Sequence, residues 1–155
     1  MKSLLFTAIF AAISITGFTQ TKLSGALTRE EKLNEEYCSG IFKSSEGTIL
    51  DLQSNNNGAM GYLNILDWLD GRVSGLTVYK TRNGNRIALI RGQQTSIYVD
   101  ETPVNAGFLN SLPVSDIAMI KVIKSPFFGG FNGGGGAIAI YTIGSEEEEL
   151  EDGGN

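Results

Sequence analysis

The feature that most constrains the fold is a run of residues at positions 117–124 that alternates without ever showing a polar face. Ile117, Met119 and Ile123 fall on one side of an extended chain, and Ala118, Ile120 and Val122 fall on the other. A strand that is apolar on both sides is usually covered on both sides. We therefore expect residues 117–124 to form the central strand of a small domain, with residues 137–143 as a neighbouring strand.

Shorter elements precede this strand. Residues 60–73 carry apolar side chains at three- and four-residue steps, which predicts an amphipathic helix that ends near Gly71 and Gly75. Residues 76–81 and 86–91 resemble two strands joined at the hairpin signal Asn83-Gly84. Residues 48–52 and 96–100 also alternate as strands do, and residues 108–112 are expected to form one helical turn before Pro113.

Composition excludes several functions. The chain has 155 residues, no His, one Cys and a formal net charge of −5. One Cys without His excludes a His/Cys zinc site and a Ser-His or Cys-His catalytic pair, and the acidic balance argues against nucleic-acid binding. We predict no catalytic residue, no metal, no cofactor and no small-molecule substrate. Asp100 and Glu101 are interpreted as turn residues rather than an acid–base pair.

The two ends differ in character from the middle. Residues 1–19 have a positive start, an apolar run and small residues before Gln20, as a cleaved signal peptide does. Residues 20–45 are polar, and Thr28 with Glu31 predicts a capping box for a short helix. Residues 46–143 are expected to be the folded domain, and residues 144–155 a disordered acidic tail.

Five motifs in order resemble those of TonB-dependent receptor plug domains, in the form found in Bacteroidota. They are Trp68-Leu-Asp-Gly-Arg-Val-Ser-Gly-Leu-Thr-Val, Ile90-Arg-Gly, Tyr98-Val-Asp-Glu-Thr-Pro-Val, Ser115-Asp-Ile-Ala-Met-Ile-Lys-Val-Ile-Lys-Ser-Pro and Gly134-Gly-Gly-Ala-Ile-Ala-Ile-Tyr-Thr. The resemblance covers roughly residues 61–143. It implies an α+β fold with a small mixed β-sheet and short helices. In full receptors such a domain sits inside an outer-membrane barrel, and TonB pulls on an N-terminal box to open it.

The sequence departs from the family pattern at several points. Residues 20–45 contain no clear TonB box. TonB is therefore a possible partner for which the sequence shows no recognised binding segment. Glu101 replaces the usual Gly of the family's turn, and Lys121 stands where the family usually has an acid. The chain is also too short for a large membrane barrel, which needs many strands of roughly 9–11 residues each.

Six residues are candidates for contact with a partner protein. In the family, arginines at the position of Arg91 tend to pair with acids on the barrel wall, and the guanidinium fork suits that geometry. A solvated Arg at a strand end is the alternative. The reversed charge at Lys121 and the aromatic residues beside the glycine-dense loop complete the set: Arg91, Gly92, Lys121, Phe127, Phe128 and Phe131. The three Phe residues are equally consistent with a core position.

These features predict an exported plug-domain protein that is not an enzyme. It would lie in the periplasm against the outer membrane, and would bind and occlude or gate a barrel protein or a secretion channel. The alternative is a truncated TonB-dependent transport receptor without an independent function. The glycine-dense loop at residues 127–136 lacks the spacing of a phosphate-binding loop, so we interpret it as a site of close backbone packing.

Overall fold

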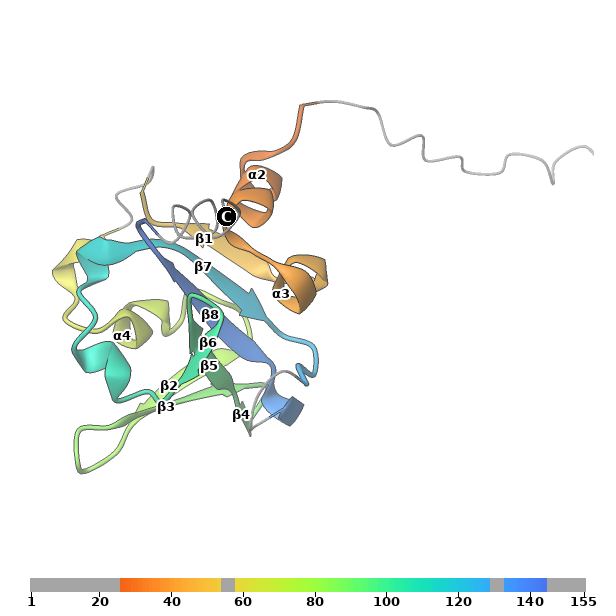
Figure 1. Cartoon of the computed structure of the whole chain (residues 1–155). Coiled ribbons are helices and arrows are strands. Elements are labelled where there is room, and N and C mark those ends of the chain that lie inside the picture. The colour runs from red at the N-terminus through yellow and green to blue at the C-terminus, as the bar shows by residue number, and fades with distance from the viewer. Residues whose placement is uncertain (1–25, 54–57, 129–132, 145–155) are drawn as a thin grey trace, which may run out of the picture.

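The computed structural model describes residues 26–53, 58–128 and 133–144, and two β-sheets organise them (Figure 1). The larger sheet has five strands in the order β1-β7-β8-β5-β6. It is mixed, because β5 (Ser96–Val99) runs parallel to β8 (Ala137–Thr142) while the other neighbours are antiparallel. The α+β fold with a small mixed sheet and short helices is therefore confirmed.

The two strands expected at residues 117–124 and 137–143 both form. β7 (Ile117–Ile123) is buried along its whole length and pairs with β8 on one side and with β1 (Thr48–Asp51) on the other. The expectation that β7 is the central strand is wrong in detail, because β8 holds the middle position. β6 (Thr102–Val104) completes the sheet as the second strand of a tight hairpin with β5.

The predicted hairpin belongs to a second, separate sheet. β2 (Leu76–Lys80) pairs in antiparallel fashion with β3 (Arg86–Ile90), and β3 pairs with the two-residue strand β4 (Gln93–Gln94). Gly84 has the positive φ of 80° that the hairpin turn requires. The motif order indicated the strands, but it carried no information on how they divide between two sheets.

The larger sheet separates two apolar clusters. Ile138 and Ile140 of β8 face the cluster that includes α4 and the second sheet, whereas Ala139 and Tyr141 face the cluster beneath the N-terminal helices. The assignment of Ile117 to the same face as Met119 is wrong. A register shift between Ile117 and Met119 interrupts the alternation, so Ile117 joins Ile120 and Val122 instead.

The helix expected at residues 60–73 is much shorter than predicted. The segment divides into the 3-10 helix η1 (Ala59–Gly61) and the one-turn helix α4 (Ile65–Leu69). The Asn64 side chain accepts a hydrogen bond from the Leu66 N–H at 2.9 Å and starts α4 there. Leu63, which the periodic pattern placed in the apolar stripe, is 93% exposed because it precedes this cap.

Two N-terminal helices cover the outer face of the larger sheet (Figure 1). α2 (Arg29–Tyr37) begins at the predicted capping box of Thr28 and Glu31, and α3 (Gly40–Ser44) follows after Cys38 and Ser39. Leu33, Cys38 and Phe42 are buried against β7 and β8. The remaining short turns are η2 (Phe108–Asn110), η3 (Val114–Asp116) and η4 (Gly133–Gly135).

The described residues contain no helix that is long and apolar enough to cross a membrane. The signal peptide expected at residues 1–19 and the tail from residue 145 lie outside the described residues.

Candidate partner-contact surface

Arg91 and Gly92 form the turn between β3 and β4. Both have positive φ angles, 53° and 80°, as the two central residues of a tight hairpin turn do. The Arg91 N–H donates to the Gly75 carbonyl at 2.8 Å, which holds this turn against the start of β2. Both residues are exposed, so the Arg91 guanidinium lies at the surface rather than in the core.

The glycine-dense loop reaches the same end of the molecule. A Cβ atom at Gly135 would lie 2.0 Å from the Gln94 carbonyl oxygen, so only Gly allows the loop to approach β4 this closely. Gly136 combines a φ of 78° with a similar approach to the Ile123 carbonyl oxygen, at 2.2 Å. The prediction of close backbone packing for this loop therefore holds at Gly135 and Gly136.

We name this end of the molecule the glycine-loop end and define it by Arg91, Gly92, Lys124, Ser125 and Phe128. A cavity of about 350 Å³ lies there, lined by Arg91, Lys124, Ser125 and residues 46–48. Two cations and one acid, Glu46, line it, so a partner would meet a surface that is basic on balance.

The three candidate Phe residues fall into different environments. Phe127 is 2% exposed and packs in the core, with ring centroids 4.9 Å from Phe42 and 5.6 Å from Tyr98. Phe128 is 85% exposed beside it. Phe131 lies outside the described residues. The structure thus separates a core anchor from an exposed aromatic side chain, where the sequence left both possibilities open.

Lys121 is buried, so its charge does not reach the surface. The side chain lies under α2 and α3, where its ammonium group donates to the Asn34 Oδ1 and to the Phe42 carbonyl oxygen, each at 2.6 Å. Burial lowers the pKa of Lys121 below its ordinary value. Nothing in the sequence indicated this environment, because residues 20–45 looked too polar to cover a sheet.

The acids of the β5–β6 turn are both engaged in hydrogen bonds. Asp100 accepts from the Thr142 N–H at 2.8 Å and from its hydroxyl at 2.7 Å. Glu101 accepts from the Ser39 N–H at 2.6 Å and from the Tyr141 hydroxyl at 3.1 Å, and also bonds the Ser39 hydroxyl. The residue that departs from the family's Gly therefore ties the N-terminal helices to the sheet, despite a φ of 62°.

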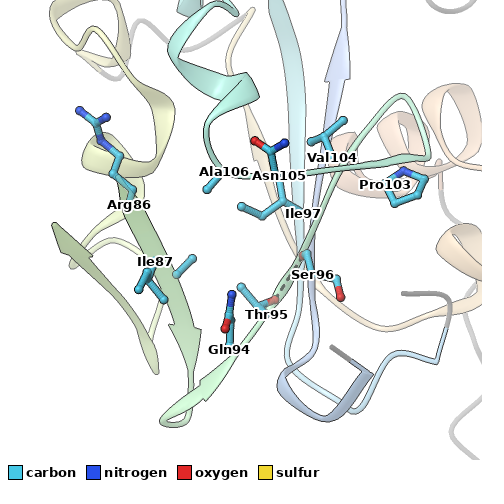
Figure 2. Close-up of a pocket in the computed structure, with 11 residues that line it drawn as sticks. Arg86, Ile87, Gln94, Thr95, Ser96, Ile97, Pro103, Val104, Asn105 and Ala106 are labelled. Carbon is cyan, nitrogen blue, oxygen red and sulfur yellow. Dashed lines mark hydrogen bonds between the residues drawn. The ribbon is translucent and has the colours of Figure 1, made fainter. Parts of the chain in front are cut away.

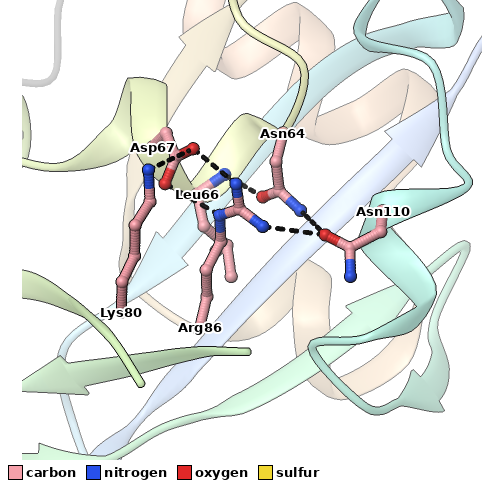
Figure 3. Close-up of polar contacts among 6 residues, drawn as sticks. All are labelled: Asn64, Leu66, Asp67, Lys80, Arg86 and Asn110. Carbon is pink, nitrogen blue, oxygen red and sulfur yellow. Dashed lines mark hydrogen bonds and ion pairs between the residues drawn. The ribbon is translucent and has the colours of Figure 1, made fainter. Parts of the chain in front are cut away.

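A polar cluster that the sequence did not reveal joins α4 to the second sheet. Figure 3 shows the Arg86 guanidinium reaching Asp67 through two hydrogen bonds, of 2.8 and 2.6 Å, and Asn110 through a third, of 2.8 Å. Lys80 also lies 3.1 Å from Asp67, and Asn64 donates to Asn110 at 2.9 Å. These residues come from four separate segments, so no local spacing could have predicted the cluster.

The electrostatic consequences follow from the contacts. The hydrogen bond from Arg86 lowers the pKa of Asp67, so this carboxylate stays ionised. Burial raises the pKa of the Cys38 thiol, which suits an unreactive core side chain. Among the described residues, no group of three acids, Cys or His is placed to hold a metal ion.

Two packed sheets, short helices and a glycine loop held against a hairpin define a small α+β domain of the plug type. The family model "TonB-dependent Receptor Plug Domain" matches residues 43–138. The chain belongs to this family. No curated protein sequence matches it.

Solved structures with the same fold are receptors and importers of much greater length. The RagAB peptide importer in its open-open state aligns with a TM-score of 0.52 and 19% identity over 64% of this chain and 12% of its own. A mutant of the ferric enterobactin receptor PfeA from Pseudomonas aeruginosa aligns with a TM-score of 0.53 and 20% identity over 77% of this chain and 19% of its own. The present chain thus spans less than a fifth of either.

Proposed function

We propose that this protein is an exported plug module that binds an outer-membrane barrel protein or a secretion channel from the periplasmic side, and occludes or gates it. The observation that carries this proposal is the family match across residues 43–138, over a fold that the receptor structures share. The role is one of binding, without chemistry of its own.

The glycine-loop end is the surface that we assign to the partner. Arg91 and Lys124 would face acids on the partner, and the Arg fork would allow bidentate pairing with a carboxylate. The exposed ring of Phe128 would supply apolar contact beside them. Lys121 is excluded from this surface by its burial.

A second candidate function follows from the lengths. Because the chain spans 12% and 19% of the two receptor structures, it is also consistent with one domain of a transport receptor that has no independent role. Sequencing the DNA on either side of the gene separates the two. Barrel-strand codons in any reading frame after residue 155 would favour the receptor fragment.

An affinity purification from detergent-solubilised cell envelopes tests the proposed binding. We expect the tagged protein to recover a barrel protein, and the double variant Arg91→Glu with Phe128→Asp to recover much less of it. Arg82→Glu is the matched control, because Arg82 is an exposed Arg in the β2–β3 turn, outside the glycine-loop end. Recovery of no barrel protein, or equal recovery by the double variant, would contradict the proposal.

A further inference from the structure

A pocket separates the two sheets on the side away from α2 and α3. Its volume is about 320 Å³, and Figure 2 shows it between β3 and the β5–β6 hairpin, with Gln94 and Thr95 closing one end. The apolar side chains of Ala88, Ile97 and Val104 belong to the lining. Because the pocket lies between β3 and the β5–β6 hairpin, backbone groups of these strands border it.

The β3 edge that borders this pocket is only partly paired. The Thr81 N–H donates to the Asn85 carbonyl, and the Arg91 N–H donates to the Gly75 carbonyl, so the odd-numbered residues of β3 face β2. The even-numbered residues therefore face the opposite side, toward β4 and the pocket. There Thr95 donates to the Ala88 carbonyl at 3.1 Å, and β4 pairs only with Leu89 and Ile90.

The backbone groups of Arg86 and the N–H of Ala88 consequently border the pocket beyond the end of β4. In the part of the chain that the structure describes, no strand continues the pairing there. At the other edge of this sheet a side chain occupies a backbone donor. The Asp70 side chain accepts a hydrogen bond from the Val78 N–H of β2 at 3.0 Å. Such a contact is one way to block strand addition, and the β3 edge lacks it.

The facing strand β6 presents an incomplete hydrogen-bonding edge. The β5–β6 turn closes on Val99 and Thr102, so the next residue, Pro103, directs its nitrogen to the free edge, where it has no hydrogen to donate. The recognition edge of the pocket is therefore β3. The side chains of β5 and β6 form its opposite wall.

We propose that this pocket binds a short extended peptide segment of another protein by strand addition to the Arg86–Ala88 edge. Main-chain hydrogen bonds would provide affinity, and Ala88, Ile97 and Val104 would receive the alternate apolar side chains. The peptide would be uncharged at this point. The one charged side chain in the lining, Arg86, is already neutralised by Asp67. This site shares no residue with the glycine-loop end and does not depend on a barrel partner.

A synthetic peptide tests the proposal on the purified protein. The probe is an extended hexapeptide of alternating Thr and Val, with a terminal Lys for solubility. We expect its binding to shift the amide resonances of Arg86 and Ala88 in ¹H–¹⁵N spectra and to slow their hydrogen exchange. The amide of Val78, which Asp70 already caps, serves as the internal control and should not respond.

The matched control peptide has the same side chains and is N-methylated at alternate positions. Loss of one hydrogen bond should weaken binding about tenfold. Ala106→Trp, which would place a bulky ring in the lining of the pocket, should weaken binding of the unmodified peptide by at least as much. Absence of binding, equal binding of the methylated peptide, or shifts confined to other residues would each overturn the proposal.

Discussion

At the scale of single residues, the most unusual feature of this plug is a buried cation, Lys121. Lys121 is 2% exposed, and its two short hydrogen bonds go to neutral acceptors, Asn34 and Phe42. An ammonium group in such a place is stabilised by hydrogen bonds but not by a contacting carboxylate, so desolvation dominates and lowers its pKa. The residue joins the strand β7 to both N-terminal helices, at the cost of burying a charge.

This burial predicts a pH dependence of stability. The unfolded chain keeps the Lys121 proton up to its ordinary pKa of 10.5, while the folded chain loses it at lower pH. Between these two values the unfolded state binds more protons, so the free energy of unfolding should rise with pH. In Lys121→Met that rise should be absent.

Chemical denaturation between neutral pH and about pH 9 measures this effect, because nearer pH 10 the buried Tyr98 and Tyr141 hydroxyls, whose pKa values are raised, add a slope of opposite sign. Cys38→Ala is the appropriate background, because the raised pKa of the Cys38 thiol gives a slope of opposite sign at similar pH. Lys32→Met, at an exposed position of α2, is the control and should keep the slope of the parent protein. Identical slopes for Lys121→Met and Lys32→Met would contradict the prediction.

At the scale of elements, the Asp67–Arg86 pair determines how α4 meets the second sheet. Both side chains are largely buried, 19% and 14% exposed, and their contact is bidentate. Asp67→Asn should lower the free energy of unfolding at neutral pH by roughly 1.5–3 kcal/mol, the contribution of a hydrogen bond to a charged group. Because the pKa of Asp67 is lowered in the folded state, this stabilisation is complete above the ordinary value of 3.8.

Acidification should remove the difference between the two proteins. As the pH falls through the lowered pKa of folded Asp67, the parent protein loses this contribution and Asp67→Asn does not. Urea denaturation of both proteins from pH 7 to pH 2 provides the measurement. Asp116→Asn is the control, at an exposed acid in η3. A constant gap between parent and Asp67→Asn at all pH values would show that the pair does not titrate as argued.

The contact of the glycine loop with β4 gives a second prediction at this scale. A methyl group at Gly135 would collide with backbone atoms of Gln93 and Gln94, which cannot rotate away. Gly135→Ala should therefore destabilise the protein by about 1–3 kcal/mol, the range for overpacking. Gly61→Ala meets nothing within 4 Å and is the matched control. Thermal melting of both variants decides the matter, and equal midpoints would refute the close approach.

The sequence was sufficient for elements whose signals are local. The alternation in β7 and β8, the Asn-Gly hairpin and the Thr28 capping box each depend on a few neighbouring residues, and each formed. The failures had long-range causes. The Asn64 cap starts α4 in the middle of the segment whose periodic pattern predicted one longer helix. A bulge moved Ile117 to the other face of the sheet. The position of Lys121 depends on helices 79 and 87 residues away along the chain.

At the scale of the whole molecule, the described chain is a sheet that needs cover on both faces. α4 and the second sheet cover one face, and α2 with α3 cover the other. Burying Leu33 and Phe42 contributes roughly 3–6 kcal/mol, at 1.5–3 kcal/mol for each side chain. A small domain has a total stability of about 5–15 kcal/mol, so the N-terminal helices account for a large share of it.

This comparison predicts that residues 46–143 alone are insufficient for a stable fold. A variant that begins at Glu46 would expose the aromatic face formed by Tyr98, Phe127 and Tyr141, and should bind a hydrophobic dye and melt at a lower temperature. A variant that begins at Ala26 keeps every described contact and should behave as the full chain does. If the shorter variant melted with the same midpoint and bound no dye, α2 and α3 would not be needed to cover this face of the sheet. In that case the polar segment could act separately from the plug. A lower melting temperature of the variant that begins at Glu46 would instead show that the helices and the plug unfold as one cooperative unit.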